Sequence, residues 1–156
     1  MRVAIGSDHR GYLVKDKLIQ MLEGWGHTVR DVGAHSEESV DYPDIAALVG
    51  QLVAQQQVER GILVCGTGIG MAITANKIPG IRATTCNDEI SAEMCRRHND
   101  VNVLCLSGDL LGERNPENML RLWLETEFEG GRHARRLGKI ADLESQQLPE
   151  RTESGE

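Results

Sequence analysis

Short apolar runs alternate along the chain with longer stretches in which apolar residues recur every three or four positions. The short runs predict five strands, at residues 2–6, 27–32, 62–65, 81–86 and 101–106. The longer stretches predict amphipathic helices between the strands, because residues at that spacing share one helix face. Strands that alternate with helices form a parallel sheet covered on both faces, so the pattern predicts an α/β fold. From this pattern alone we expect the strand order 2-1-3-4-5, which is common in doubly wound proteins.

Proline and glycine mark the ends of the predicted helices. Breaks in the pattern fall at Pro43, Pro79-Gly80, Pro116 and Gly130-Gly131. A helix-forming run begins at Met71 after the third strand, and the helix that Pro116 opens carries apolar residues as far as Phe128. The chain shows no internal repeat or linker. We predict one domain over residues 1–144, which includes a C-terminal helix, and a polar tail over residues 145–156 that we expect to fray.

Composition and charge exclude several classes of function. The chain has 156 residues and a formal net charge of −7, which argues against nucleic acid or an anionic membrane as its main partner. No apolar run approaches the roughly 18 residues of a membrane span, and the first residues do not resemble a signal peptide. The four cysteines lack CxxC or CxxH spacing, so we expect reduced thiols, a cytoplasmic location and no zinc site.

A glycine-rich loop follows the third strand and carries a thiol at its start, Cys65. Glycines alternate there with Thr67 and Ile69, at Gly66, Gly68 and Gly70. A strand, a glycine turn and a helix in that order favour an anion, because the free N–H groups and the positive helix end point toward it. The spacing matches neither a dinucleotide loop nor a Walker loop. The alternative is a tight packing turn in which Cys65 is only a small apolar residue.

Other polar residues also fall where a ligand could bind. Asp8 and His9 follow the first strand, although Asp8 could merely cap a helix. His98 and Asn99 lie at a predicted helix end, where a histidine often serves only the helix dipole. Arg132 and Arg136 are one turn apart and can grip one phosphate, or they are a solvated helix start. Tyr42, just before Pro43, either packs against the core or lines a pocket.

Together these segments resemble the type B ribose-5-phosphate isomerases, a family that includes allose- and galactose-6-phosphate isomerases. The matching motifs, spread over roughly nine-tenths of the chain, are SDHRG (7–11), DYPD (41–44), CGTGIG (65–70) with ANK (75–77), GIRA (80–83), RRHNDVNVL (96–104) and EGGRHARR (129–136). The resemblance implies a three-layer Rossmann-like sandwich with a five-stranded parallel sheet of order 2-1-3-5-4. It also implies no metal ion or organic cofactor, and a homodimer, or a dimer of dimers, whose active sites are shared between subunits.

The resemblance further implies an aldose–ketose isomerase that interconverts ribose 5-phosphate and ribulose 5-phosphate through a cis-enediolate. Cys65 would be the base, Thr67 would exchange a proton with the C1 and C2 oxygens, and His98 would open the sugar ring in the partner's site. The substrate contacts would be Asp8 and Asn99 to hydroxyls, the backbone around Gly66, Gly68, Ile69 and Gly70 to the enediolate, and His9, Arg132 and Arg136 to the phosphate. A second branch of the family places a glutamate at the position of Met71, so this chain falls in the thiol branch.

One position departs from the family. Many members carry an arginine eleven residues after the ring-opening histidine, where this chain has Asp109. Arg114 or Arg10 could compensate, phosphate binding could be weaker, or the substrate could differ in length. Allose 6-phosphate, galactose 6-phosphate and a four-carbon sugar phosphate therefore stay open as substrates.

Two other classes of function are also compatible with the residues. One is a dimer that binds a sugar phosphate without turning it over. The other is a cysteine hydrolase with a dyad of Cys65 and His98.

Overall fold

The structure, a computed structural model, describes residues 1–111 and 115–146 and contains one five-stranded sheet. Its strands are β1 (Arg2–Ser7), β2 (Thr28–Asp31), β3 (Arg60–Cys65), β4 (Ala83–Thr85) and β5 (Val103–Ser107). All neighbouring strands pair in parallel, in the order β2-β1-β3-β5-β4. The order implied by the family resemblance is therefore confirmed, and the order 2-1-3-4-5 expected from the pattern is wrong. The physical reason is burial: β5 is buried along its whole length, whereas the short β4 is only half-buried and lies at the edge.

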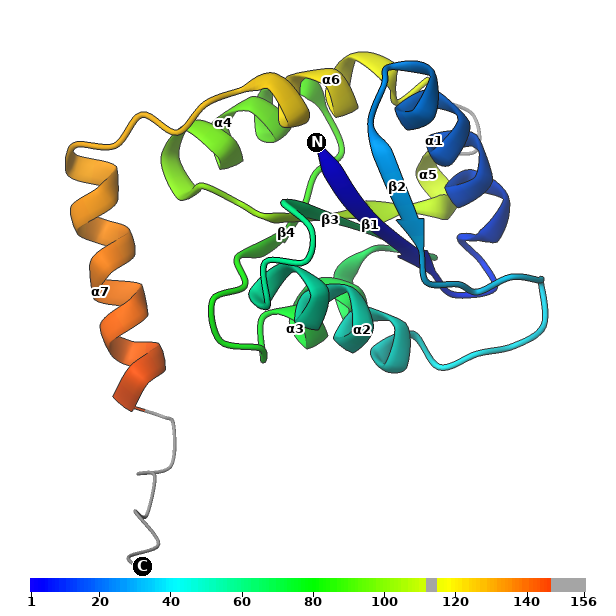
Figure 1. Ribbon diagram of the computed structural model, residues 1–156, viewed down its shortest axis with the longest axis horizontal. Coiled ribbons are helices and arrows are strands. Elements are labelled where there is room, and N and C mark those ends of the chain that lie inside the picture. Colours follow the sequence, from blue (N-terminus) through cyan, green and yellow to red (C-terminus); the bar gives the residue numbers. More distant parts are fainter. Residues whose placement is uncertain (112–114, 147–156) are drawn as a thin grey trace, which may run out of the picture.

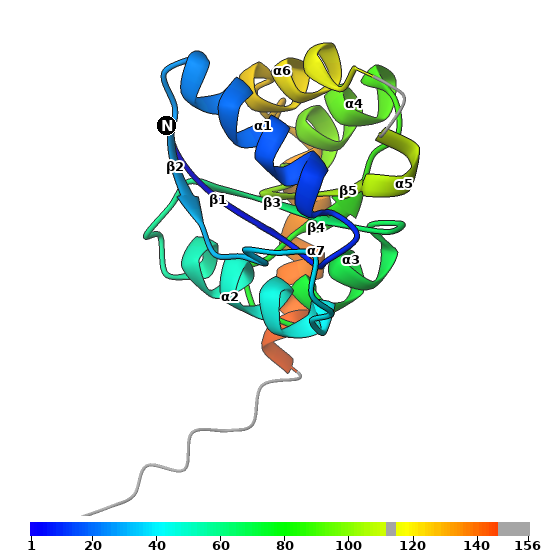
Figure 2. The same ribbon diagram turned by 90° about the vertical axis from the view of Figure 1, so that its right-hand side faces the viewer.

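Helices cover both faces of the sheet, which gives the three layers that the sequence predicts (Figures 1 and 2). The helices are α1 (Tyr12–Gly24), α2 (Tyr42–Ala54), α3 (Ile69–Ala75), α4 (Glu89–Asn99), α5 (Gly108–Leu111), α6 (Glu117–Glu125) and α7 (Arg132–Gln146). One face carries α1, α4 and α6, and the other carries α2 and α3. Helix α7 stands apart from this body as an arm (Figure 1).

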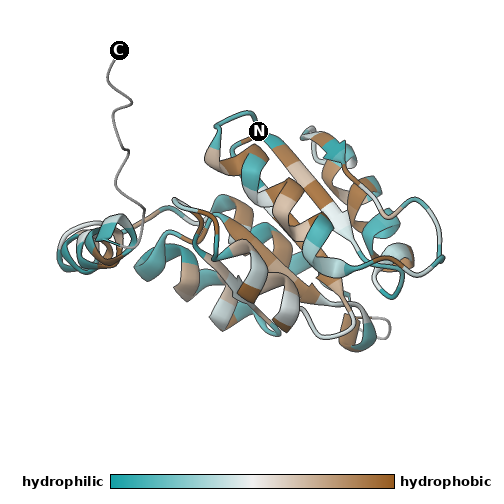
Figure 3. Cartoon of the chain, turned by 90° about the horizontal axis from the view of Figure 1, so that it is seen from below, coloured by the Kyte–Doolittle hydropathy of each residue, from teal (hydrophilic) through white to brown (hydrophobic). Residues whose placement is uncertain are grey.

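Each face of the sheet has its own hydrophobic core. On the α1–α4–α6 side the core surrounds Trp123, which is fully buried together with Leu18 and Leu104. On the α2–α3 side it includes Met71, Val49 and Cys65. The strands are mostly hydrophobic along their length, while the helices alternate between hydrophobic and hydrophilic residues (Figure 3). Among the described residues, no helix combines the length and apolarity needed to cross a membrane.

Several predicted boundaries differ from the structure. Helix α3 begins at Ile69 rather than Met71, so its first turn includes part of the glycine loop. Helix α6 ends at Glu125, because Thr126 adopts an extended conformation, and Phe128 lies beyond it. The four-residue helix α5 follows β5 directly and was not predicted. Helix α7 includes Ser145 and Gln146, and the rest of the predicted tail, residues 147–156, lies outside the described residues.

A buried lysine holds the segment at the end of β2. The Lys15 ammonium, which is fully buried, donates to both carboxylate oxygens of Asp31 at 2.8 Å and to the Ala34 carbonyl at 2.7 Å. This segment, residues 31–34, pairs with the end of β1, because the Ala34 N–H donates to the Ser7 carbonyl at 2.7 Å. This clamp fixes the chain just before Asp8.

We predict that Lys15→Met lowers the free energy of unfolding by about 3 kcal/mol, because the change leaves Asp31 and the Ala34 carbonyl without their partner. Lys17→Met, at an exposed position of the same helix, is the matched control and should change it by less than about 0.5 kcal/mol. Chemical denaturation measures both values. A similar small change in the two variants would contradict the clamp.

Candidate active site

The glycine loop turns one of its amides toward the Cys65 thiol. Cys65 ends β3 and is buried, and the Gly68 N–H donates to its sulfur at 3.1 Å. This turn requires glycine: Gly68 has φ +79°, and a Cβ there would lie 3.2 Å from the backbone of Cys105 and Leu106. The loop therefore places an amide donor next to the sulfur.

Two further contacts hold the loop at the carboxyl edge of the sheet. The Ser107 hydroxyl, at the end of β5, donates to the Gly66 carbonyl at 2.6 Å. Thr67 is exposed at the mouth, and its hydroxyl oxygen accepts from the Ile69 N–H at 3.3 Å. On the far side of the loop, a Cβ on Gly70 would lie 2.6 Å from the Tyr42 ring, so that ring packs directly on the loop. Tyr42 therefore packs against the loop, and its role in lining a pocket stays a prediction.

The segment after β1 lies at the same edge. The Asp8 carboxylate is buried and accepts from the N–H groups of Arg10 and Gly11 at 2.9 and 3.0 Å, so it does hold the turn that leads into α1. The Val40 N–H donates to His9 Nδ1 at 3.4 Å, which puts the proton of the neutral ring on Nε2. Asp8 and His9 therefore lie near the Cys65 loop, as predicted.

Asp109 is paired with an arginine of this segment. Arg10 Nη2 donates to Asp109 Oδ2 at 2.5 Å, although the two residues are 99 positions apart in sequence. The Arg10 guanidinium also covers the loop, since a Cβ on Gly66 would lie 3.1 Å from Arg10 Nε. Of the two arginines that could compensate for Asp109, the structure pairs Arg10 with it, and Arg114 lies outside the described residues.

The remaining predicted site residues lie at the opposite edge of the sheet. Helix α4 starts after the carboxyl end of β4 and returns to the amino end of β5, so His98 and Asn99 lie at that amino edge. Strands of five residues separate the two edges by about 16 Å. Arg132 and Arg136 lie on the first turns of α7. The same helix carries His133, whose ring stacks on that of His98. Within one chain, the structure does not bring Cys65 and His98 together.

His133 belongs to this second group, and the sequence reasoning missed it. Its ring stacks on that of His98, with centroids 4.2 Å apart and planes 7° from parallel. Burial, helped by the nearby positive charge of Arg132, lowers the pKa of His133, so the ring is neutral at pH 7. The sequence does contain a signal for His133, since it directly follows the candidate phosphate ligand Arg132 in the EGGRHARR segment.

The same group offers three possible metal ligands, but its arrangement does not suit a cation. Ligand atoms of His98, Glu129 and His133 lie within 4.8 Å of one another. The lone pair of a histidine nitrogen lies in the plane of its ring, so an ion bound by both histidines would have to lie in both ring planes. The two rings are stacked in nearly parallel planes, so one ion cannot do so. Glu129 is also committed to Arg97, whose Nε donates to it at 2.6 Å and lowers the pKa of the carboxyl group.

Fold and site together define a Rossmann-like α/β protein with a thiol-bearing glycine loop at the carboxyl edge of its sheet. The model of the Ribose/Galactose Isomerase family matches residues 3–140, and the chain belongs to this family. Ribose-5-phosphate isomerase B from Escherichia coli is 41% identical over 92% of this chain and 96% of its own length. D-erythrulose-4-phosphate isomerase from Pectobacterium atrosepticum is 37% identical over 94% of this chain and 97% of its own.

A solved structure shows the same fold. Ribose-5-phosphate isomerase B from Clostridium thermocellum superposes with a TM-score of 0.92 and 44% identity, over 95% of this chain and 100% of that one. The family identified from sequence motifs is therefore confirmed, together with its five-stranded sheet.

Proposed function

We propose that this protein is an aldose–ketose isomerase that interconverts ribose 5-phosphate and ribulose 5-phosphate through a cis-enediolate, with Cys65 as the base. The observation that carries the proposal is the contact between the Gly68 N–H and the Cys65 sulfur at the mouth of the loop. Hydrogen bonds to an ionised acceptor are the stronger ones, so this geometry suits a thiolate that can take a proton from C2 and return it to C1.

The loop also supplies what the intermediate needs. An enediolate carries negative charge on its oxygens, and backbone amides aimed at that charge are worth roughly 3 kcal/mol per donor in comparable sites. The Gly68 amide lies against the thiol, and we assign the enediolate to the backbone amides of this loop, from Gly66 to Gly70. The exposed Thr67 hydroxyl can pass a proton between the C1 and C2 oxygens. Asp8 would hold a sugar hydroxyl beside them.

The residues for ring opening and phosphate binding would come from a partner subunit. His98 and Asn99, with Arg132 and Arg136 near them, lie at the opposite edge of the sheet from the Cys65 loop of their own chain. The strands keep these edges about 16 Å apart, too far for one small sugar to touch both. A second copy has a surface to bind, because the half-buried edge strand β4 and α7 line a groove in which Ile140 and Leu143 remain 52% and 59% exposed. We therefore propose a homodimer in which His98 of each subunit opens the ring bound at the other's Cys65.

The alternatives from other classes can be distinguished from the isomerase. A hydrolase dyad of Cys65 and His98 would, like the proposed site, require a second subunit, because the two side chains lie at opposite edges of the sheet. Only the hydrolase would form a covalent acyl or phosphoryl adduct on Cys65. A protein that only binds sugar phosphates has no need for a thiol within reach of the loop amides. Among isomerase substrates, a four-carbon sugar phosphate is the strongest second candidate, since one relative is named D-erythrulose-4-phosphate isomerase.

A comparison of substrates tests the proposal. We expect the highest kcat/KM for ribose 5-phosphate in a panel that also contains allose 6-phosphate, galactose 6-phosphate and D-erythrulose 4-phosphate. A higher value for D-erythrulose 4-phosphate would replace the proposed substrate and keep the reaction class. No turnover of any member, despite binding, would favour the binding protein.

We predict that Cys65→Ala lowers kcat by at least about 100-fold, the lower end of what a positioned base contributes, and changes binding of the sugar phosphate by only a few-fold. Cys95→Ser, which alters a thiol on α4, is the control and should keep kcat. Alkylation of wild-type protein should abolish turnover, and substrate should protect against it. Near-wild-type turnover of Cys65→Ala would exclude the thiol as base.

Arg10 adds positive charge on the Cys65 side of the proposed site. In the loops at this edge, as far as the structure describes them, Arg10 supplies the only guanidinium, and Asp8 and Asp109 supply negative charge. Its pairing with Asp109 neutralises a carboxylate that would otherwise repel a phosphate dianion. We therefore assign Arg10 a role in binding the substrate phosphate, together with His9.

We predict that Arg10→Gln raises KM for ribose 5-phosphate several-fold with little change in kcat, because phosphate contacts far from the reacting carbons stabilise ground and transition states alike. Arg2→Gln is the matched control, since Arg2 is also exposed and pairs with a carboxylate, Glu59, at the opposite edge. Steady-state kinetics and inhibition by inorganic phosphate measure the effect. Equal KM values in the two variants would remove Arg10 from the site.

A further inference from the structure

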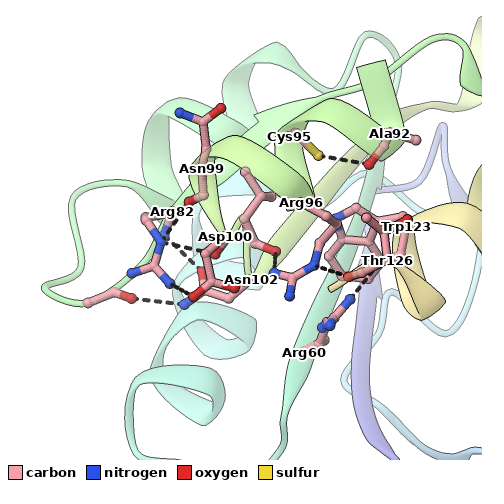
Figure 4. A network of polar contacts seen from close by, with 12 residues as sticks. Arg60, Arg82, Ala92, Cys95, Arg96, Asn99, Asp100, Asn102, Trp123 and Thr126 are labelled. Carbon is pink, nitrogen blue, oxygen red and sulfur yellow. Dashed lines mark hydrogen bonds and ion pairs between the residues drawn. The ribbon is translucent and has the colours of Figure 1, made fainter. Parts of the chain in front are cut away.

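A network of arginine contacts holds the end of α4 at the amino edge of the sheet (Figure 4). The Arg82 side chain, just before β4, donates from Nε to the Asn99 and Asp100 carbonyl oxygens and from Nη2 to Asp100 Oδ2, each at 3.0 Å. One guanidinium therefore binds three acceptors at the end of the helix that carries His98. Because Arg82 precedes β4 and α4 follows it, these contacts join the start of this unit to its end.

Asp100 adopts a backbone conformation that glycine usually supplies. It caps the end of α4 with φ +46° and ψ +44°, and its N–H donates to the Arg96 carbonyl at 3.1 Å. Helices commonly end on a glycine at this left-handed position, because a side chain there is strained. The carboxylate gives a reason for the aspartate, since it accepts from Arg96 Nη1 at 2.8 Å as well as from Arg82. The position therefore uses the side chain and not the turn alone.

Arg96 extends the network to a second segment beside His98. Its guanidinium is buried and donates to the Val101 carbonyl at 2.6 Å and, through Nε, to the Thr126 carbonyl at 3.3 Å. Thr126 follows α6 and begins the connection to α7, which carries the His133 ring that stacks on His98. Arg96 therefore holds both the end of α4 and the segment that leads to the stacking partner of His98.

Arg82 is itself fixed to the centre of the sheet. Its N–H donates to Asn102 Oδ1 at 2.8 Å, and its carbonyl accepts from the Asn102 N–H at 3.0 Å. Asn102 directly precedes β5, which is buried along its whole length. Contacts of this kind from a rigid element are what the precise placement of a functional side chain requires.

We propose that Arg82 and Asp100 are positioning residues that fix the direction of His98. This inference rests on the proposed function, in which His98 opens the sugar ring. Misplacement of a catalytic group by about 1 Å can cost on the order of 100-fold in rate, so contacts at the helix end control ring opening without touching the sugar. The proton transfer assigned to Cys65 takes place at the other edge of the same sheet and does not depend on these contacts.

Arg82→Lys tests the proposal, because lysine keeps the positive charge but lacks the planar fork that binds several acceptors at once. We expect kcat for ribose 5-phosphate, a cyclic sugar, to fall by about 10-fold, with KM changed by only a few-fold. Arg121→Lys is the matched control, since Arg121 is also partly exposed and pairs with a carboxylate, Glu117, on α6. The control should keep kcat, and chemical denaturation verifies that both variants are folded.

The reverse reaction separates the placement of His98 from a general loss of structure. Ribulose 5-phosphate cannot close a five-membered ring, because its C5 oxygen carries the phosphate, so exchange of its C1 hydrogen with D2O needs no ring opening. We expect this exchange to stay near its wild-type rate in Arg82→Lys. Equal losses of exchange and of ribose 5-phosphate turnover would overturn the proposal and assign Arg82 to the fold or the dimer.

The ring signals of His98 in an NMR spectrum test its placement without any turnover. They are assigned by their absence from His98→Asn. We expect these signals to shift in Arg82→Lys and in Asp100→Asn and to stay in place in Arg121→Lys. Unchanged signals in both Arg82→Lys and Asp100→Asn would overturn the proposal. A wild-type protein that neither isomerises ribose 5-phosphate nor exchanges the C1 hydrogen of ribulose 5-phosphate would defeat the proposed function, and the ring signals would still decide whether Arg82 and Asp100 place His98.

Discussion

The parallel direction of the strands is the constraint on which the proposed site depends. Every strand of a parallel sheet ends at the same edge, so β3 must deliver Cys65 where β1 delivers Asp8 and His9. The helix that connects two parallel strands must in turn carry the chain back to the opposite edge. Helix α4 therefore ends, with His98 and Asn99, where the sheet begins. Two groups of candidate site residues at opposite edges follow from the connectivity alone.

Charge is distributed in the same two groups. The protein is acidic overall, with a net charge of −7, so an anionic substrate requires a local concentration of positive charge. Arg132 and Arg136, on the first turns of α7, provide it at one edge. At the other edge the Cys65 loop offers amides, and Arg10 offsets Asp109. A sugar phosphate bound between two such edges would meet backbone donors at its reacting carbons and guanidinium groups at its phosphate.

How much of this could be predicted from sequence depended on the kind of interaction. Periodicity located all five strands, and the glycine spacing around Cys65 indicated the loop, because both signals are local. The order of β4 and β5 was not predicted from the pattern, although the polar residues Arg82, Thr84 and Thr85 in the fourth apolar run were a sign of an edge strand. The pairing of Arg10 with Asp109 joins residues far apart in sequence, and only the fold brings them together. The family resemblance supplied the strand order that the pattern missed, but it gave no account of Asp109.

The measurement that tests the central claim most directly is recovery of activity on mixing two inactive variants, Cys65→Ala and His98→Asn. If each site takes Cys65 from one subunit and His98 from the other, a heterodimer contains one intact site and one doubly altered site. After full subunit exchange of equal amounts, about half of the dimers are heterodimers, so about one quarter of wild-type activity should return. No recovery, with exchange verified by mass spectrometry, would contradict a site shared between subunits.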